Sequence, residues 1–372
     1  MIHHFKAFQA ASMAAFQQLR NGETRLGECL FWPTASADFQ GSLAQACVAG
    51  VKFVILGIPE DIGPRANLGN GGADLGFTAF IKRFVNLQAN PFIDAAQIWL
   101  AGEVHCADLQ QQSRDLNPQD PAQLAKLREL CAELDNRVTP LVQAIFSAGL
   151  LPIIIGGGHN NALPILRALA QHTGAAVNAV NLDPHGDFRL LEGRHSGNGF
   201  SYAKAEQWLD RYFVVGLHEL KNSAASLRQM QQAHVGFCSY QDIYLRHQYS
   251  FEASLHHAQA YFELNSKPAS TKPVALGIEV DTDSISMMPV SAFTNCGLTV
   301  NNAERYVYFF ASLPQSRYLH LAEAAPSQHP AGLTAGISEA GQVLSALVLA
   351  FIQAKQSSEA CSEQSSEKSS EQ

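Results

Sequence analysis

The chain has 372 residues with 33 acidic and 25 basic side chains, a formal net charge of −8, and 47% of its residues are hydrophobic. Only 16% are charged, against about 25% in typical soluble proteins, so the chain has enough apolar residues for a large core and is not wholly disordered. The acidic balance argues against nucleic acid as a partner, because phosphate binding requires a basic surface.

Apolar segments of strand length alternate with helical patterns along the chain. The predicted strands cover residues 51–58, 98–101, 151–155, 177–182, 213–215, 274–280 and 318–321. Helical periodicity covers residues 122–147, 162–171, 302–312 and 338–353. This alternation is typical of a three-layer α/β/α fold with a mostly parallel central sheet, which binds ligands at the C-terminal ends of its strands.

The composition changes near the C-terminus, where Ser, Glu and Gln dominate from Ser357 onward. Such a segment has little apolar surface to bury. We therefore predict one α/β domain over residues 1–355 and a disordered tail over residues 356–372.

Two features of the sequence favour a cytoplasmic protein, namely an N-terminal segment without the pattern of a secretory signal and the scattered cysteines. Residues 1–6 lack the pattern of a secretory signal, and none of the seven cysteines forms a CxxC pair. The longest apolar run, residues 149–158, is shorter than the about 18–20 residues that span a bilayer. We expect no membrane partner and a reducing compartment.

Two segments that follow predicted strands carry carboxylates and a histidine at alternating positions. Asp183, His185 and Asp187 have a spacing of two, so in an extended chain they project to one side. Glu279, Asp281 and Asp283 share this spacing after an apolar run. Like charges at such spacing repel one another unless a cation lies between them, so both segments favour metal ligation over a polar turn or a solvated edge strand.

A third segment places His159 after a predicted strand and three glycines. Alone, this pattern fits a hydrogen-bonded core histidine better than a metal ligand. Together, the three segments offer two imidazoles and about five carboxylates, a donor set that suits Mn²⁺ rather than a thiolate-bound zinc. These ligands suffice for two metals, and a pair of ions about 3.5–4 Å apart activates water for attack on an electrophilic carbon.

These three segments resemble the signatures of the ureohydrolase superfamily, which includes arginases, agmatinases and formimidoylglutamases. The signatures GGxH, DAHxD and SxDxD appear in order as residues 156–159, 183–187 and 277–281. Residues 57–67 resemble the family's first βα loop, residues 102–104 its GDV turn, and Glu323 its late glutamate. The resemblance implies an arginase-like α/β/α domain, two Mn²⁺ per chain and a homo-oligomer.

The resemblance also implies roles for individual residues. His159, Asp183 and Asp187 would hold one metal, and His185 with Asp183 the other. The third segment would complete both sites, either with Glu279 and Asp281 or, after a shift of two residues, with Asp281 and Asp283. Asp187 would also pass a proton to the leaving amine, and Glu323 would pair with the amidine nitrogens of the substrate.

Residues 188–200 resemble formimidoylglutamases more than arginases, because the asparagine and histidine that arginases place near Arg189 and Phe200 are absent. Arg189 suits a substrate with an additional carboxylate, although an ion pair with the aspartates of its own motif explains it equally well. Asn198 and Glu219 are further candidates for the amino-acid end of the substrate.

The predicted reaction is hydrolysis of a small amidine, N-formimidoyl-L-glutamate, to L-glutamate and formamide, a step of histidine degradation. Two alternatives remain. One is a ureohydrolase that releases urea from a guanidino compound such as agmatine or guanidinobutyrate. The other is a catalytically silent binding protein, which the departures from the family at Gly158, Pro184, Gly186 and Glu279 keep open.

Overall fold

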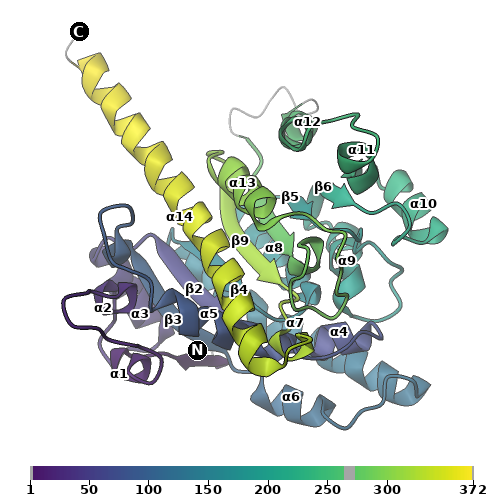
Figure 1. Ribbon diagram of the computed structural model, residues 1–372, viewed down its shortest axis with the longest axis horizontal. Coiled ribbons are helices and arrows are strands. Elements are labelled where there is room, and N and C mark those ends of the chain that lie inside the picture. Colours follow the sequence, from purple (N-terminus) through teal and green to yellow (C-terminus); the bar gives the residue numbers. More distant parts are fainter. Residues whose placement is uncertain (1–2, 264–272, 371–372) are drawn as a thin grey trace.

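The computed structural model describes residues 3–263 and 273–370, with side chains up to residue 358. Within this part of the chain, nine strands form one sheet in the order β1-β3-β2-β4-β9-β8-β5-β6-β7. Figure 1 shows the central strands of this sheet between the surrounding helices. β1 pairs antiparallel with β3, and the other pairs are parallel. The strands are β1 Phe5–Ala7, β2 Phe53–Gly57, β3 Ile98–Val104, β4 Leu151–Ile155, β5 Val177–Leu182, β6 Leu209–Leu217, β7 Gly236–Ser239, β8 Leu276–Asp281 and β9 Ser316–Ala322.

The seven predicted strands coincide with β2, β3, β4, β5, β6, β8 and β9. Sequence reasoning missed the two edge strands β1 and β7. Both edge strands are short, and neither is a continuous buried apolar run.

Two layers of helices cover the sheet and bury both of its faces. The α-helices are α1 Ala10–Met13, α2 Leu26–Cys29, α3 Phe39–Val48, α4 Ile62–Ala66, α5 Gly76–Phe84, α6 Ala107–Ser113, α7 Pro121–Ser147, α8 Ala162–Thr173, α9 Gly199–Ala205, α10 Ala224–Gln232, α11 Tyr240–Tyr244, α12 Phe251–Glu263, α13 Val300–Ala311 and α14 Leu333–Ser370. The predicted helices coincide with α7, α8, α13 and the first part of α14.

Successive residues of the strands alternate between two apolar cores. Ile153 and Ile155 of β4 belong to the core that contains residues of α5, α12, α13 and α14. Ile154 belongs to the opposite core, with residues of α3, α7, α8 and α9. This alternation confirms the three-layer α/β/α architecture and explains why the strands are apolar at every position.

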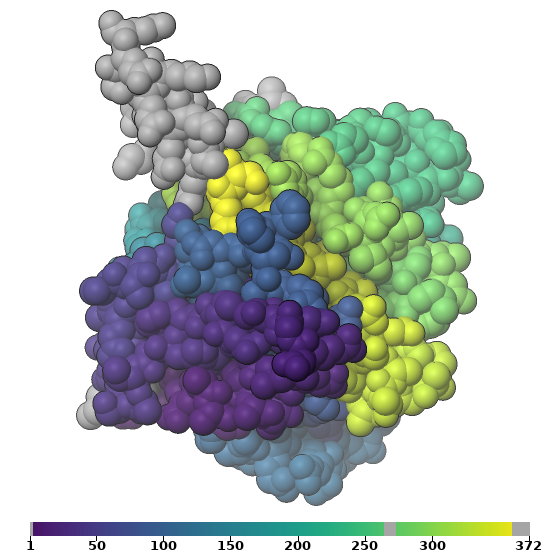
Figure 2. Space-filling view, turned by 60° about the vertical axis from the view of Figure 1, so that its left-hand side comes forward, coloured from purple at the N-terminus to yellow at the C-terminus, as the bar shows by residue number. Residues whose placement is uncertain are grey.

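The N-terminal segments extend this architecture at the β3 edge. β1 adds to β3, and Phe39 of α3 packs on Trp99 of β3 with ring centroids 5.9 Å apart. Figure 2 shows the N-terminal residues, in purple, gathered on one face of the molecule. These segments therefore cover the edge of the sheet that lies away from its central strands.

Helix α14 differs from expectation in two ways. Its residues Leu333–Ser358 are long and apolar enough to cross a membrane, since they include an 18-residue window with a mean hydropathy of 1.6, although 56% of that window is buried. It packs on α5 and α13 as a core helix does. The helix also continues to Ser370, through most of the predicted tail, because Ser, Glu and Gln can extend a helix that packing has already nucleated. The domain boundary after residue 355 and the disorder of the tail both stay predictions, and residues 371–372 lie outside the described residues.

Candidate metal centre

The predicted ligands meet at the C-terminal ends of four neighbouring strands, in the order β4, β9, β8 and β5. Because these strands are parallel, the loops that follow them leave the same edge of the sheet. The residues that converge there are His159 after β4, Asp183, His185 and Asp187 after β5, Asp281 and Asp283 at the end of β8, and Glu323 after β9.

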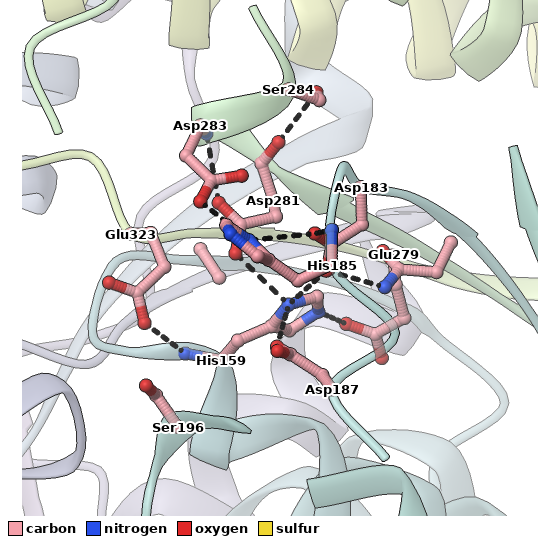
Figure 3. A network of polar contacts seen from close by, with 12 residues as sticks. His159, Asp183, His185, Asp187, Ser196, Glu279, Asp281, Asp283, Ser284 and Glu323 are labelled. Carbon is pink, nitrogen blue, oxygen red and sulfur yellow. Dashed lines mark hydrogen bonds and ion pairs between the residues drawn. The ribbon is translucent and has the colours of Figure 1, made fainter. Parts of the chain in front are cut away.

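The imidazole of His159 lies among three aspartates (Figure 3). Its Nδ1 is 3.0 Å from Oδ2 of Asp187. It is also 3.4 Å from Oδ2 of Asp183 and 3.4 Å from Oδ2 of Asp281. The His159 side chain is fully buried, and its Nδ1 has no hydrogen-bond partner among the described residues. A buried nitrogen without a partner, facing three carboxylates, is the arrangement expected of a metal ligand.

A second group shares Asp183 with the first. Nδ1 of His185 is 3.1 Å from Oδ2 of Asp283 and 3.5 Å from Oδ1 of Asp183. Asp183 is held in place, because its Oδ1 accepts the backbone N–H of His185 and its Oδ2 accepts Nδ2 of Asn181. Within each of the two groups, the potential ligand atoms all lie within 4.8 Å of one another.

The pKa shifts of these side chains indicate that the cluster has more negative than positive charge. Burial, followed by the charge of Asp183, raises the pKa of Asp187 to about 6. Burial, followed by Asp283 and Asp183, also raises the pKa of Asp281 well above its ordinary value. Burial by itself lowers the pKa of His159, but the surrounding carboxylates raise it well above its ordinary value. Without a cation, protons therefore have to neutralise the carboxylates.

The residues present fit two divalent ions. Their donors are carboxylate oxygens and imidazole nitrogens, which suit Mn²⁺ and related ions. One group is His159, Asp183, Asp187 and Asp281, and another is Asp183, His185 and Asp283. A third group, His159, Glu279 and His320, meets the same distance limit but has only one carboxylate. Asp183 belongs to the first two groups and can therefore bridge two ions.

Glu279 lies on the opposite side of the His159 ring from these aspartates (Figure 3). Its Oε2 is 3.3 Å from Nε2 of His159 and 2.6 Å from Nδ1 of His320, and its Oε1 accepts the hydroxyl of Tyr318 at 2.5 Å. Burial by itself raises the pKa of Glu279, but His320 and His159 lower it to about 2. This geometry suits a carboxylate that orients a ligating histidine and favours Asp281 and Asp283 as the ligand pair.

A cavity of about 400 Å³ opens beside the cluster. Asp187, Asp281, Asp283 and Glu323 line it, and Oε1 of Glu323 accepts the backbone N–H of His159 at 2.9 Å. Asp187 and Glu323 have positive φ angles of 44° and 66°. Such conformations cost about 1–3 kcal/mol each and cluster at functional sites. Burial, followed by Asp187 and Asp283, raises the pKa of Glu323 to about 8.

Arg189 also lines the cavity, and its side chain is 47% exposed. Its guanidinium contacts Oδ1 of Asn67 at 2.5 Å and Oε1 of Glu192 at 3.2 Å. These partners differ from the aspartates of its own motif. The guanidinium thus already has a carboxylate partner, Glu192, and a ligand carboxylate would have to share it or replace that partner at the cavity.

Asn198 and Glu219 do not line this cavity in the described part of the chain. The amide of Asn198 is fully buried, where it accepts from Arg194 at 2.8 Å and donates to the carbonyl of Gly193 at 2.8 Å. Glu219 pairs with Arg246 and accepts the hydroxyl of Ser239. Both side chains are thus occupied by other protein groups, contrary to their expected contact with substrate.

The family model described as the arginase family matches residues 51–347. The chain belongs to the arginase family. A formimidoylglutamase of Aromatoleum aromaticum is 26% identical over 306 residues, which cover 77% of this chain and 80% of that protein. Two solved structures of similar fold are a Trypanosoma cruzi formiminoglutamase with Mn²⁺ (TM-score 0.65, 18% identity, 89% of this chain and 98% of that one) and the Bacillus subtilis formimidoylglutamase (TM-score 0.68, 15% identity, 91% and 93%).

One departure from the arginase-family signatures has a structural reason. A Cβ at Gly158 would lie 2.3 Å from Cδ of Pro64, so a side chain does not fit there. Sequence reasoning missed the buried Glu60, whose Oε1 accepts the backbone N–H of Gly158 at 2.7 Å and Nδ2 of Asn161 at 2.7 Å. Glu60 therefore holds the glycine loop that positions His159. Its position within residues 57–67, which resemble the family's first βα loop, was the available signal.

Proposed function

We propose that this arginase-family protein is a two-manganese hydrolase that cleaves a C–N bond of N-formimidoyl-L-glutamate. Addition of water to the formimidoyl carbon and loss of the amine give L-glutamate and formamide. The observation that carries this proposal is the pair of overlapping ligand groups that share Asp183, beside a cavity that Arg189 also lines. The similarity to proteins named formimidoylglutamase supports the choice of substrate.

In this proposal, His159, Asp183, Asp187 and Asp281 hold one ion, and Asp183, His185 and Asp283 hold the other. When bound, the two ions supply the activation of water at neutral pH and stabilise negative charge that develops on the substrate. Glu279 stays outside the ligand set. Its carboxylate fixes the orientation of the His159 ring from behind, which raises the basicity of the ligating nitrogen.

The other side chains of the cavity bind and orient the substrate. Glu323 faces the cavity beside the proposed ligands. Bound cations would offset the neighbouring aspartates that raise its pKa, so that its carboxylate can pair with the cationic formimidoyl group. Arg189 binds a carboxylate of the glutamate part through its guanidinium. Asp187 lies at the wall of the cavity and transfers a proton to the amine nitrogen as the C–N bond breaks.

Replacement of Asp187 with asparagine tests its role in proton transfer. The amide retains an oxygen but carries no transferable acidic proton, so we expect kcat to fall by about 10²–10⁴-fold in saturating Mn²⁺. Steady-state formamide release, with bound metal counted in the same samples, measures the effect. Two bound ions together with unchanged kcat would show that Asp187 does not transfer the proton.

Product analysis tests the proposed function as a whole. The manganese-loaded chain is incubated with N-formimidoyl-L-glutamate, agmatine and 4-guanidinobutyrate, and formamide, ammonia and urea are measured. We expect equimolar formamide and glutamate from the first compound and no urea from the others. Urea release would establish a guanidino substrate instead, and no turnover of any compound would favour a binding protein.

Three further properties belong to this proposal. A role in histidine catabolism follows from the substrate, and a cytoplasmic location fits the cysteine usage of the sequence. We expect a homo-oligomer, because members of the family commonly form homo-oligomers.

A further inference from the structure

The cavity beside the proposed metal centre is lined by groups of both charges. Carboxylates of the proposed ligands and of Glu323 line it, and so do the two cations Arg189 and Lys221. The two cations come from separate loops, after β5 and after β6. A ligand that fits this cavity therefore needs a cationic end and more than one anionic group.

Lys221 has no carboxylate within ion-pair distance among the residues that the structure describes. It is half-buried, in contrast to the more exposed Leu220 beside it. Glu219, two residues earlier, pairs with Arg246 and does not line the cavity in the described part of the chain. An anion bound in the cavity would supply this ammonium with the counter-ion that it lacks among the described residues.

The loop that carries Lys221 is fixed to the loop of the predicted ligands. Oδ1 of Asn222 accepts the backbone N–H of Gly186 at 2.8 Å, and its Nδ2 donates to the carbonyl of Pro184 at 3.0 Å. Both partners lie inside the segment 183–187. Lys221 is thereby held at a defined position relative to the proposed metal centre.

The N-terminus of α10 adds positive potential to the lining of the same cavity. Ser223 precedes this nine-residue helix, and both Ser223 and Ser226 line the cavity. The first turn of a helix carries a partial positive charge and N–H groups that favour anions. The ammonium of Lys221 and the first turn of α10 thus act in the same direction.

We propose that Lys221, together with the first turn of α10, binds one carboxylate of the substrate while Arg189 binds the other. This assignment rests on the proposed function and makes it more specific, because it requires a dicarboxylate amidine. The same two cations oppose a substrate whose far end is an ammonium group, such as agmatine. Lys221 is therefore a determinant of specificity at this site.

The test compares three formimidoyl compounds that differ in their carboxylates. N-formimidoyl-L-glutamate has both, N-formimidoyl-4-aminobutyrate lacks the α-carboxylate, and N-formimidoyl-L-2-aminobutyrate lacks the γ-carboxylate. The manganese-loaded full chain and its variants Lys221→Met and Lys221→Arg are assayed with each. Lys126→Met, an exposed residue of α7, is the matched control.

For Lys221→Met we expect kcat/KM for the dicarboxylate to fall by about 10- to 100-fold, the usual effect of losing one charged hydrogen bond. The same variant should lose comparably on one of the two monocarboxylates and stay within about twofold on the other, since only one of them retains the carboxylate that Lys221 binds. Lys221→Arg should retain most of the activity, and Lys126→Met should match the unmodified chain.

Two results would overturn the assignment in distinguishable ways. An equal loss on all three compounds, or no loss on any, would show that Lys221 does not bind a carboxylate although the enzyme works as proposed. If the unmodified chain turns over none of the three, the proposed function itself fails and the assignment fails with it.

Discussion

Asp183→Asn is expected to abolish the metal centre and its chemistry. Asp183 belongs to both ligand groups and contacts both histidines, with its oxygens 3.4 Å from Nδ1 of His159 and 3.5 Å from Nδ1 of His185. Metal-activated water and charge stabilisation together contribute at least about 4 kcal/mol to catalysis, so formamide release should fall by about 10³-fold or more. Bound manganese should fall below two ions per chain.

The measurement is formamide release and metal content of the same purified sample after dialysis against Mn²⁺. Asp210→Asn is a matched control, because Asp210 is an exposed residue of β6 outside both ligand groups. A variant at position 183 that keeps two ions and normal turnover would contradict the shared-ligand role. Loss of activity in the Asp210 variant as well would point to a general effect of the substitution.

Substitutions of Asp283 and of Glu279 are expected to differ strongly in their effects on metal binding and turnover. Asp283 lies 3.1 Å from Nδ1 of His185, whereas Glu279 contacts His159 from behind and is enclosed by His320 and Tyr318. Asp283→Asn should therefore lose about one of the two ions and lower turnover by about 10²-fold or more. Glu279→Gln should retain two ions with weaker affinity, by about 10- to 100-fold, as is usual for a residue that orients a ligand.

Glu279→Gln should also destabilise the fold, because it leaves the buried His320 without its charged partner. A decrease of about 1–3 kcal/mol in the free energy of unfolding is expected. Metal counting and urea unfolding of the metal-free chains measure the two effects independently. The opposite pattern, one ion lost in the Glu279 variant and none in the Asp283 variant, would restore Glu279 and Asp281 as the ligand pair.

The sequence predicted the central strands and the convergence of the ligands because both depend on local patterns. Fully apolar strands mark a sheet covered on both faces, and polar residues directly after them meet at one edge. The register of the third segment was not decidable in this way, since Glu279, Asp281 and Asp283 share one spacing. In the structure, Glu279 and Asp281 of β8 contact different nitrogens of His159, and the turn Thr282–Ser284 places Asp283 against His185.

Contacts between distant loops account for the residues that sequence reasoning misplaced or missed. Glu219 was expected at the substrate, but Arg246, 27 residues later, binds its carboxylate. Its neighbour Lys221 lines the cavity instead. Similarly, the role of Glu60 depends on the glycine loop about 100 residues away. Spacing along the chain contains no information on such pairings, whereas the folded chain shows them directly.

The carboxylate cluster is proposed to act as a two-ion centre that hydrolyses a formimidoyl compound. The most direct test titrates the metal-free full chain with Mn²⁺ and measures the rate of formamide release from N-formimidoyl-L-glutamate against the number of ions bound. We expect the rate to rise to a plateau at two bound ions per chain. A chain that binds two ions and releases no formamide, or one that is fully active with none bound, would contradict it.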